Sequence, residues 1–144
     1  MNVEVNYLTV LVAGLASIVV GGVWYALFGK LLQKIRPLTP AEQQGLKKQM
    51  KAMFGVGFLL TLLMAYVLFY VVKMSESYLD LSPVLTALAT GCFMYVGFVV
   101  PVQANHIIFG NYGALSKKLK LFVINTGGQF VSLLAMALVI GLMK

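Results

Sequence analysis

The fold is decided at residues 24–30, Trp-Tyr-Ala-Leu-Phe-Gly-Lys, where a long apolar run ends in aromatic residues, a glycine and a lysine. The run contains about 22 residues, from Tyr7 to Phe28, and no charged side chain interrupts it. A hydrocarbon core about 30 Å thick is crossed by roughly 20 helical residues. Trp24, Tyr25 and Phe28 suit the aromatic belt at the membrane interface. The stretch therefore predicts the end of a first membrane-spanning helix.

The composition extends this prediction to the whole chain. Of its 144 residues, 60% are hydrophobic and only 10% are charged, whereas soluble domains carry about a quarter charged residues. We expect a single all-α membrane domain with four spans and two cytoplasmic segments. The spans are expected at about residues 7–28, 53–72, 83–102 and 120–143, and the cytoplasmic segments at 29–52 and 103–119.

Three sequence signals predict where helices begin. Thr39 can cap a helix, Pro40 suits its first position, and Glu42 stands where a capping box needs its acid. The second helix is thus expected to start well before the membrane. Ser82-Pro83 is a similar signal for the third span, and Ser116 is a candidate cap for the last.

Pro101 predicts a kink or a helix end, because its ring would meet the carbonyl group of Gly97 four residues earlier. Residues 103–110 then mix apolar side chains with Gln103, Asn105 and His106. Either a bent helix or a short re-entrant or interfacial segment fits this pattern.

The distribution of charge predicts the orientation. Most of the Lys and Arg residues lie in the two connections after the first and third spans, which the positive-inside rule places in the cytoplasm. The opposite side holds Glu4, Lys73, Glu76, Asp80 and Lys144. Both termini are therefore expected outside.

The net charge of +7 follows the same pattern, which argues against nucleic acid as a partner. The partners expected are the lipid bilayer and, at the basic cytoplasmic segments, anionic lipid headgroups.

Small residues recur at helical spacing on several spans and predict faces for close helix packing. The alternative is that such a face lines a pore or a substrate groove. The residues assigned to helix packing are Ala13, Ser17, Gly21, Gly57, Thr61, Gly97 and Pro101.

The chain is expected not to be an enzyme and to hold no metal or cofactor. It has one histidine and one cysteine, no carboxylate lies within a predicted span, and no catalytic or nucleotide-binding motif occurs. The polar residues of the last span stand out instead. Asn125, Gln129 and Ser132 share one face, and Thr90 on the third span is a candidate partner.

Two interpretations of this face remain open. The amides form hydrogen bonds between helices, or they make a neutral polar site for a small solute or a dehydrated ion. The candidate residues at the cytoplasmic mouth are Trp24, Gln103, Asn105 and His106, in gating or ligand contact. For His106 the alternative is a hydrogen bond at a helix end.

Phe28-Gly29-Lys30 ends the first span, and Phe109-Gly110-Asn111 follows the third at the same predicted depth. This match suggests a parallel two-helix repeat. The junction of Trp24-Tyr25 with Phe28-Gly29-Lys30, together with Gly97, Asn105, Phe109 and Ile124-Asn125, resembles a bacterial membrane-protein family called domain of unknown function 1761. The resemblance covers nearly the whole chain and implies a four-helix integral membrane protein without an assigned activity.

The sequence predicts a multi-pass protein of the bacterial cytoplasmic membrane that forms a homo-oligomer. Its expected function is that of an oligomeric channel or small-solute transporter. The alternative is a structural or regulatory subunit that binds another membrane protein. A hydrated cavity at the Asn125, Gln129 and Ser132 face would favour transport, and a face occupied by side-chain hydrogen bonds would favour the subunit.

Overall fold

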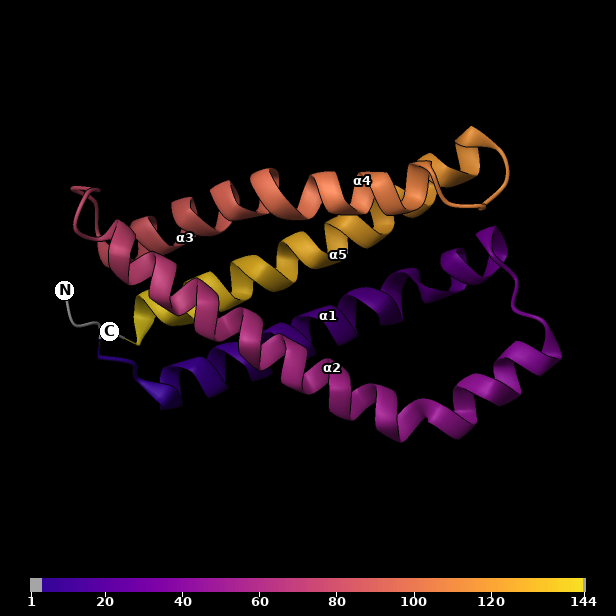
Figure 1. Cartoon of the computed structure of the whole chain (residues 1–144), viewed down its shortest axis with the longest axis horizontal. Helices are drawn as coiled ribbons and strands as arrows, with labels where there is room; N and C mark the ends of the chain where they lie inside the picture. Colours follow the sequence, from indigo (N-terminus) through magenta and orange to yellow (C-terminus); the bar gives the residue numbers. More distant parts are fainter. Residues whose placement is uncertain (1–3, 144) are drawn as a thin grey trace.

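The computed structural model describes residues 4–143, and within that range it contains helices and no strands (Figure 1). The elements are α1 (Tyr7–Ile35), α2 (Pro40–Ser75), α3 (Pro83–Met94), the π-helical turn η1 (Tyr95–Val99), α4 (Val100–Ile108) and α5 (Leu115–Leu142). The segments α3, η1 and α4 follow one another without a break. The chain thus forms four helices that are long and apolar enough to cross a membrane, which confirms the predicted all-α class.

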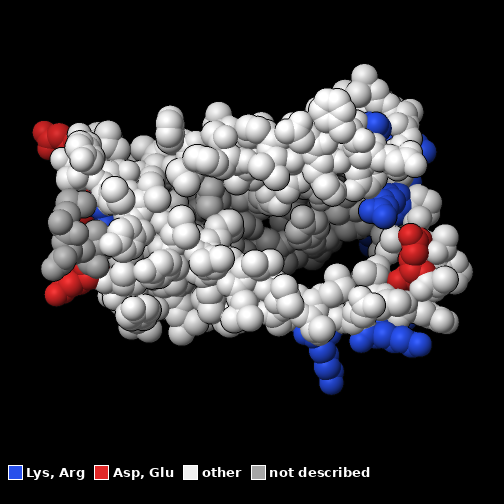
Figure 2. Space-filling view, viewed as in Figure 1, with Lys and Arg blue, Asp and Glu red and all other residues white. Residues whose placement is uncertain are grey.

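Helix α5 lies at the centre and packs against α1, α3 and α4. Both ends of the chain lie at the same end of the bundle (Figure 1), and Figure 2 shows Lys and Arg mostly at the opposite end. Which end faces the cytoplasm stays a prediction from charge. Lys144, one of the residues counted on the outer side, lies outside the described residues.

The tightly packed core occupies the half of the bundle nearest the termini. Residues there without exposed surface include Ala13, Ala65, Val72, Ala87, Met136 and Ala137. In the other half α2 diverges from α1 (Figure 1), and from Pro40 to Gly57 each of its residues is exposed except the half-buried Gly45. Helix α2 has 36 residues and is about 54 Å long, so it extends beyond a hydrocarbon core of about 30 Å.

The helix continues through Pro101, so the predicted helix end is wrong there, while the predicted kink stays a prediction. The π-helical turn η1 lies immediately before it, and the backbone N–H of Val100 donates to the carbonyl oxygen of Tyr95, five residues back. Proline has no N–H to donate, and the wider turn accommodates its ring within a continuing helix. Helix α4 then extends to Ile108, so this region is helical and not a re-entrant loop.

The predicted helix starts have different outcomes. Thr39 and Glu42 form the expected capping box at the start of α2. Ser82 precedes α3, but its side chain makes no capping hydrogen bond. The prediction for Ser116 is wrong, because α5 begins at Leu115 after Ala114. Gly113, with φ of 82°, already makes the turn that leads into the helix, so Ser116 falls in its first turn.

The predicted two-helix repeat stays a prediction. Phe28 packs on Trp24 with 4.5 Å between the ring centroids, whereas Phe109 is 83% exposed. The two Phe-Gly corners therefore have different surroundings.

The capping box at α2 gives a pH-dependent prediction. The backbone N–H and the hydroxyl of Thr39 each donate to the Glu42 carboxylate at 2.8 Å, and with the nearby charge of Arg36 they hold the pKa of Glu42 below its ordinary value of 4.5. The stabilisation is therefore present above pH 4.5 and is lost as the pH falls through the lower folded pKa. A carbon-13 NMR titration of the Glu42 carboxyl should have its midpoint below 4.5, and Thr39→Ala should move the midpoint upward. An unshifted midpoint in the unmodified protein would contradict the prediction.

Candidate functional site

Trp24 of α1 packs against α5 and connects these two helices. Its indole N–H donates to the backbone carbonyl oxygen of Ile124 at 2.9 Å. A Cβ atom added at Gly127 or Gly128 would come within 2.8 Å or 2.7 Å of the indole ring. These two glycines therefore make the space that Trp24 fills, and Trp24 does not line the pocket described below.

The small-residue face of α1 packs mainly against α5. Ala13 is fully buried and Ser17 is 5% exposed. A Cβ atom at Gly21 would lie 3.1 Å from Oγ of Ser132 on α5, and one at Gly14 would lie 2.9 Å from Leu62 of α2. Small side chains let these helices approach closely, which matters because lipid supplies no hydrophobic force between them.

The other residues assigned to packing lie in more open positions. No heavy atom lies within 4 Å of the position that a Cβ would occupy at Gly57 or Gly97, and Pro101 is exposed. The hydroxyl of Thr61 donates to the carbonyl oxygen of Gly57 in its own helix at 2.8 Å. At Gly57 and Gly97, therefore, no other helix packs closely against the small residue within this chain.

A polar pocket of about 350 Å³ lies where α1, α4 and α5 meet near the basic end of the bundle. Its lining residues are Tyr25, Val102, Gln103, His106, Asn125 and Gln129. The structure thus brings the amides of Asn125 and Gln129 into one pocket with two of the four candidate mouth residues, Gln103 and His106. Asn105 is exposed and does not line this pocket.

A second pocket, of about 340 Å³, continues toward the middle of the bundle. Ser17, Thr61 and Ser132 line it, and it shares Tyr25 and Gln129 with the first. We call the two pockets together the polar groove. The face of the molecule seen in Figure 2 is hollowed between α2 and the α4–α5 pair.

The polar side chains of the groove are not bonded to one another. Across residues 4–143, no hydrogen bond joins the side chain of Gln103, Asn125, Gln129, Ser17 or Ser132 to another residue. An amide or hydroxyl without a partner is unfavourable when it is removed from water. These groups are therefore available to a ligand that both donates and accepts hydrogen bonds.

No carboxylate lines the groove, and His106 is its one titratable nitrogen base. Within the described part of the chain, no three His, Cys, Asp or Glu residues lie close enough to hold a metal ion. The groove thus presents mainly amide and hydroxyl groups for hydrogen bonding.

Thr90 lies apart from the groove. It is 6% exposed on α3, and its hydroxyl, like those of Thr86 and Thr126, is buried without a partner in the described structure. Tyr95 donates its hydroxyl to the carbonyl oxygen of Thr126 at 2.8 Å. The third span thus meets the last through Tyr95, and neither Thr90 nor Tyr95 contributes to the groove.

Ser17 lines the second pocket, as the groove alternative for its small-residue face predicts. The place of Tyr25 in the expected aromatic belt did not indicate its role in the groove, yet Tyr25 lines both pockets. Ser17, Gly21 and Tyr25 are spaced four residues apart and so share one face of α1. That spacing was the available signal, because a face that contacts α5 through Ser17 also directs Tyr25 toward α5.

Comparison with known proteins gave one family. The model of a family described as "Protein of unknown function (DUF1761)" matches residues 8–141. No curated protein and no solved structure matches the chain.

Proposed function

Because the chain belongs to the DUF1761 family of proteins of unknown function, we propose a function from the geometry of the groove. The protein is a non-enzymatic membrane protein that binds a small, neutral, hydrogen-bonding solute in the polar groove and transports it. It acts as a homo-oligomer in the bacterial cytoplasmic membrane. Four helices long and apolar enough to cross a membrane, with polar side chains facing a pocket, support this role.

One observation carries the proposal, namely the unbonded amides of Gln103, Asn125 and Gln129 around a single pocket. Amides that only held helices together would be bonded across the helix interface. A site built from hydrogen-bonding groups selects ligands that satisfy those groups, because other ligands leave them unpaired. Neutral amides and hydroxyls match a neutral polar solute.

The shape of the bundle supports a site with access from one side. Polar groove residues extend toward the basic end, where α2 diverges, whereas the packed core that includes Val72 and Met136 closes the end near the termini. Transport then requires a second conformation in which the packed end opens.

The alternative, a subunit that binds another membrane protein, draws on a different feature. Residues 40–57 of α2 are almost wholly exposed and have both apolar and basic side chains. Such a helix is suited to contact with a partner in the membrane.

A flux measurement tests the proposal. The purified protein is reconstituted in liposomes, and the uptake of urea and of glycerol is followed by stopped-flow light scattering. We expect faster uptake of at least one probe than in empty liposomes. Gln129→Leu should slow that uptake by about tenfold, the effect of losing one hydrogen bond of about 1.4 kcal/mol.

The matched control is Gln33→Leu, which removes the same amide at an exposed position of α1 outside the groove. It should leave uptake unchanged. Equal melting temperatures of the two variants would exclude misfolding as the cause. Uptake of both probes at the rate of empty liposomes would refute the proposed solute class.

A further inference from the structure

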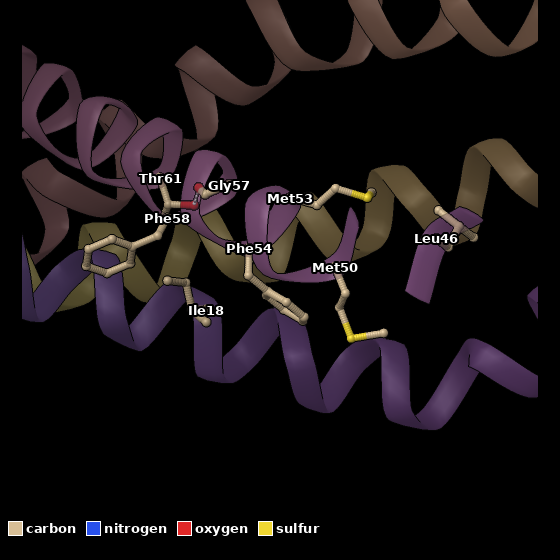
Figure 3. A pocket seen from close by; sticks show the side chains of 8 residues that line it. All are labelled: Ile18, Leu46, Met50, Met53, Phe54, Gly57, Phe58 and Thr61. Atoms are coloured by element: carbon tan, nitrogen blue, oxygen red, sulfur yellow. Dashed lines mark hydrogen bonds between the residues drawn. The ribbon is translucent and has the colours of Figure 1, made fainter. Parts of the chain in front are cut away.

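A further pocket, separate from the two that form the polar groove, lies between α1 and the divergent half of α2 (Figure 3). It has a volume of about 510 Å³ and is lined by Ile18 of α1 and by residues of α2 from Leu46 to Thr61. We call it the α1–α2 wedge. The side chains of Met50, Phe54 and Phe58 mark its α2 side in Figure 3.

The wedge is suited to hydrocarbon. Its lining is apolar apart from the hydroxyl of Thr61, which is already bonded to the carbonyl oxygen of Gly57. Phe54 is 71% exposed and Met53 is 52% exposed. The chain itself therefore leaves large apolar side chains in the wedge without a cover. Methionine and phenylalanine adapt well to a flexible apolar ligand.

The hollow is elongated along the helix. From Leu46 to Thr61 the helix rises about 22 Å, and the space of about 510 Å³ follows that length. A hydrocarbon chain has the same elongated form, so an acyl chain fits the wedge.

Charge at the basic end of the wedge indicates which lipid it takes. Lys47, Lys48 and Lys51 are exposed, and no ion pair occupies them in the described residues. Along the helix axis, Lys51 lies only about 4.5 Å from Phe54. The nearby acid, Glu42, is held by Thr39. Lys47 and Lys51 are spaced seven residues before Phe54 and Phe58, so they share an edge of the helix with these two lining residues. Cations at that edge complement the anionic headgroup of a lipid whose acyl chain occupies the wedge.

We propose that the α1–α2 wedge is a binding site for an anionic phospholipid of the leaflet at the basic end. One acyl chain lies along Ile18, Phe54 and Phe58, and the phosphate group lies beside Lys47 and Lys51. The wedge shares Ile18 and Thr61 with the polar groove. The bound chain therefore forms the wall that separates the groove from bulk lipid. This site does not depend on transport by the groove.

Native mass spectrometry tests the site with two probes, phosphatidylglycerol and phosphatidylcholine of the same acyl chains. The protein is extracted from vesicles that contain equal amounts of both. We expect the retained lipid to be mainly phosphatidylglycerol. Gly57→Phe should lose most of it, because Gly57 lines the wedge and has open space around it, so the ring fills the wedge without a clash.

Gly55→Phe is the matched control. Gly55 is equally open and does not line the wedge, so this variant should retain phosphatidylglycerol like the unmodified protein. Equal retention by both phenylalanine variants and the unmodified protein would overturn the proposal. A second result would also overturn it: the unmodified protein is a dimer, and Gly57→Phe makes it a monomer without changing lipid retention. A second copy of the chain, and not a lipid, would then cover the wedge.

The lysines are tested separately. Lys47→Gln with Lys51→Gln should lower the retained ratio of phosphatidylglycerol to phosphatidylcholine by about tenfold. The same two changes at Lys117 and Lys120, on the other basic segment, should leave the ratio unchanged. An equal fall in both double variants would show a general surface charge effect and would overturn the assignment of the headgroup.

Discussion

Replacement of Gly128 by leucine is expected to push α1 away from α5 and to lower the melting temperature of the purified protein strongly. A Cβ atom at this position would lie 2.7 Å from Cδ1 and 3.0 Å from Nε1 of the Trp24 ring. The indole must therefore leave, and its hydrogen bond to Ile124 is lost with it. Overpacking of this kind costs about 1–3 kcal/mol, and the hydrogen bond contributes about 1 kcal/mol more. Thermal unfolding in mild detergent, followed by circular dichroism, measures the effect.

A second substitution makes the test specific for the contact. Trp24→Ala removes the ring that leucine would meet, so the double variant should recover part of the stability lost in Gly128→Leu. Gly22→Leu is the control, because no heavy atom lies within 4 Å of its added Cβ. If the double variant melts at or below the temperature of Gly128→Leu, the indole is not what the glycine accommodates.

Replacement of Gly141 by leucine should have a comparable or larger effect at the other end of α5. An added Cβ atom would lie 2.7 Å from Cα of Val84 and 3.1 Å from the carbonyl oxygen of Pro83. These are backbone atoms, so no change of rotamer relieves the contact, and α3 must move as a whole. We expect a loss of about 3 kcal/mol or more, or a protein that does not fold, as measured by thermal unfolding and by the yield of monodisperse protein.

The control for this prediction is Gly97→Leu, where the same side chain enters open space. It should melt close to the unmodified protein. A Gly141→Leu protein with an unchanged melting temperature would mean that α3 and α5 do not approach closely at that point.

The two contacts define how the bundle is built around the groove. Gly141 lies at the packed end, where α3 and α5 are in backbone contact. Trp24 joins α1 to α5 nearer the basic end, one residue before Tyr25, which lines the groove. Helix α2 has no such contact from Pro40 to Gly57. The bundle is therefore closed at one end and open beside α2 at the other.

The polar face of the last span shows how far the sequence could predict the site. The spacing of Asn125, Gln129 and Ser132 placed them on one face of a helix, because helical periodicity is a local property. Their proximity to Gln103 and His106 could not be predicted in the same way. It depends on the π-helical turn before Pro101, whose extra residue changes which side chains of α4 face α5.

The small residues show the limit of another sequence pattern. The spacing of Ala13, Ser17 and Gly21 indicated a face that permits close approach, and α5 makes that approach. The same spacing in α2 includes Gly57 and Thr61, yet these residues line open space. A small side chain allows a contact without providing the partner, so the pattern alone does not show where two helices meet.

By itself, the sequence determined the class of the protein. Its evidence is local: four apolar runs long enough to cross a bilayer, the capping box at Thr39, and the segregation of charge. Each segment partitions between lipid and water according to its own residues, so no tertiary contact is needed to predict these features. Only the tertiary structure decided that Trp24 lies over Gly127 and Gly128, that the amides share a groove with Gln103 and His106, and that α2 stands clear. The reason is that helices in lipid associate through shape and hydrogen bonds, and both depend on residues that lie far apart in the chain.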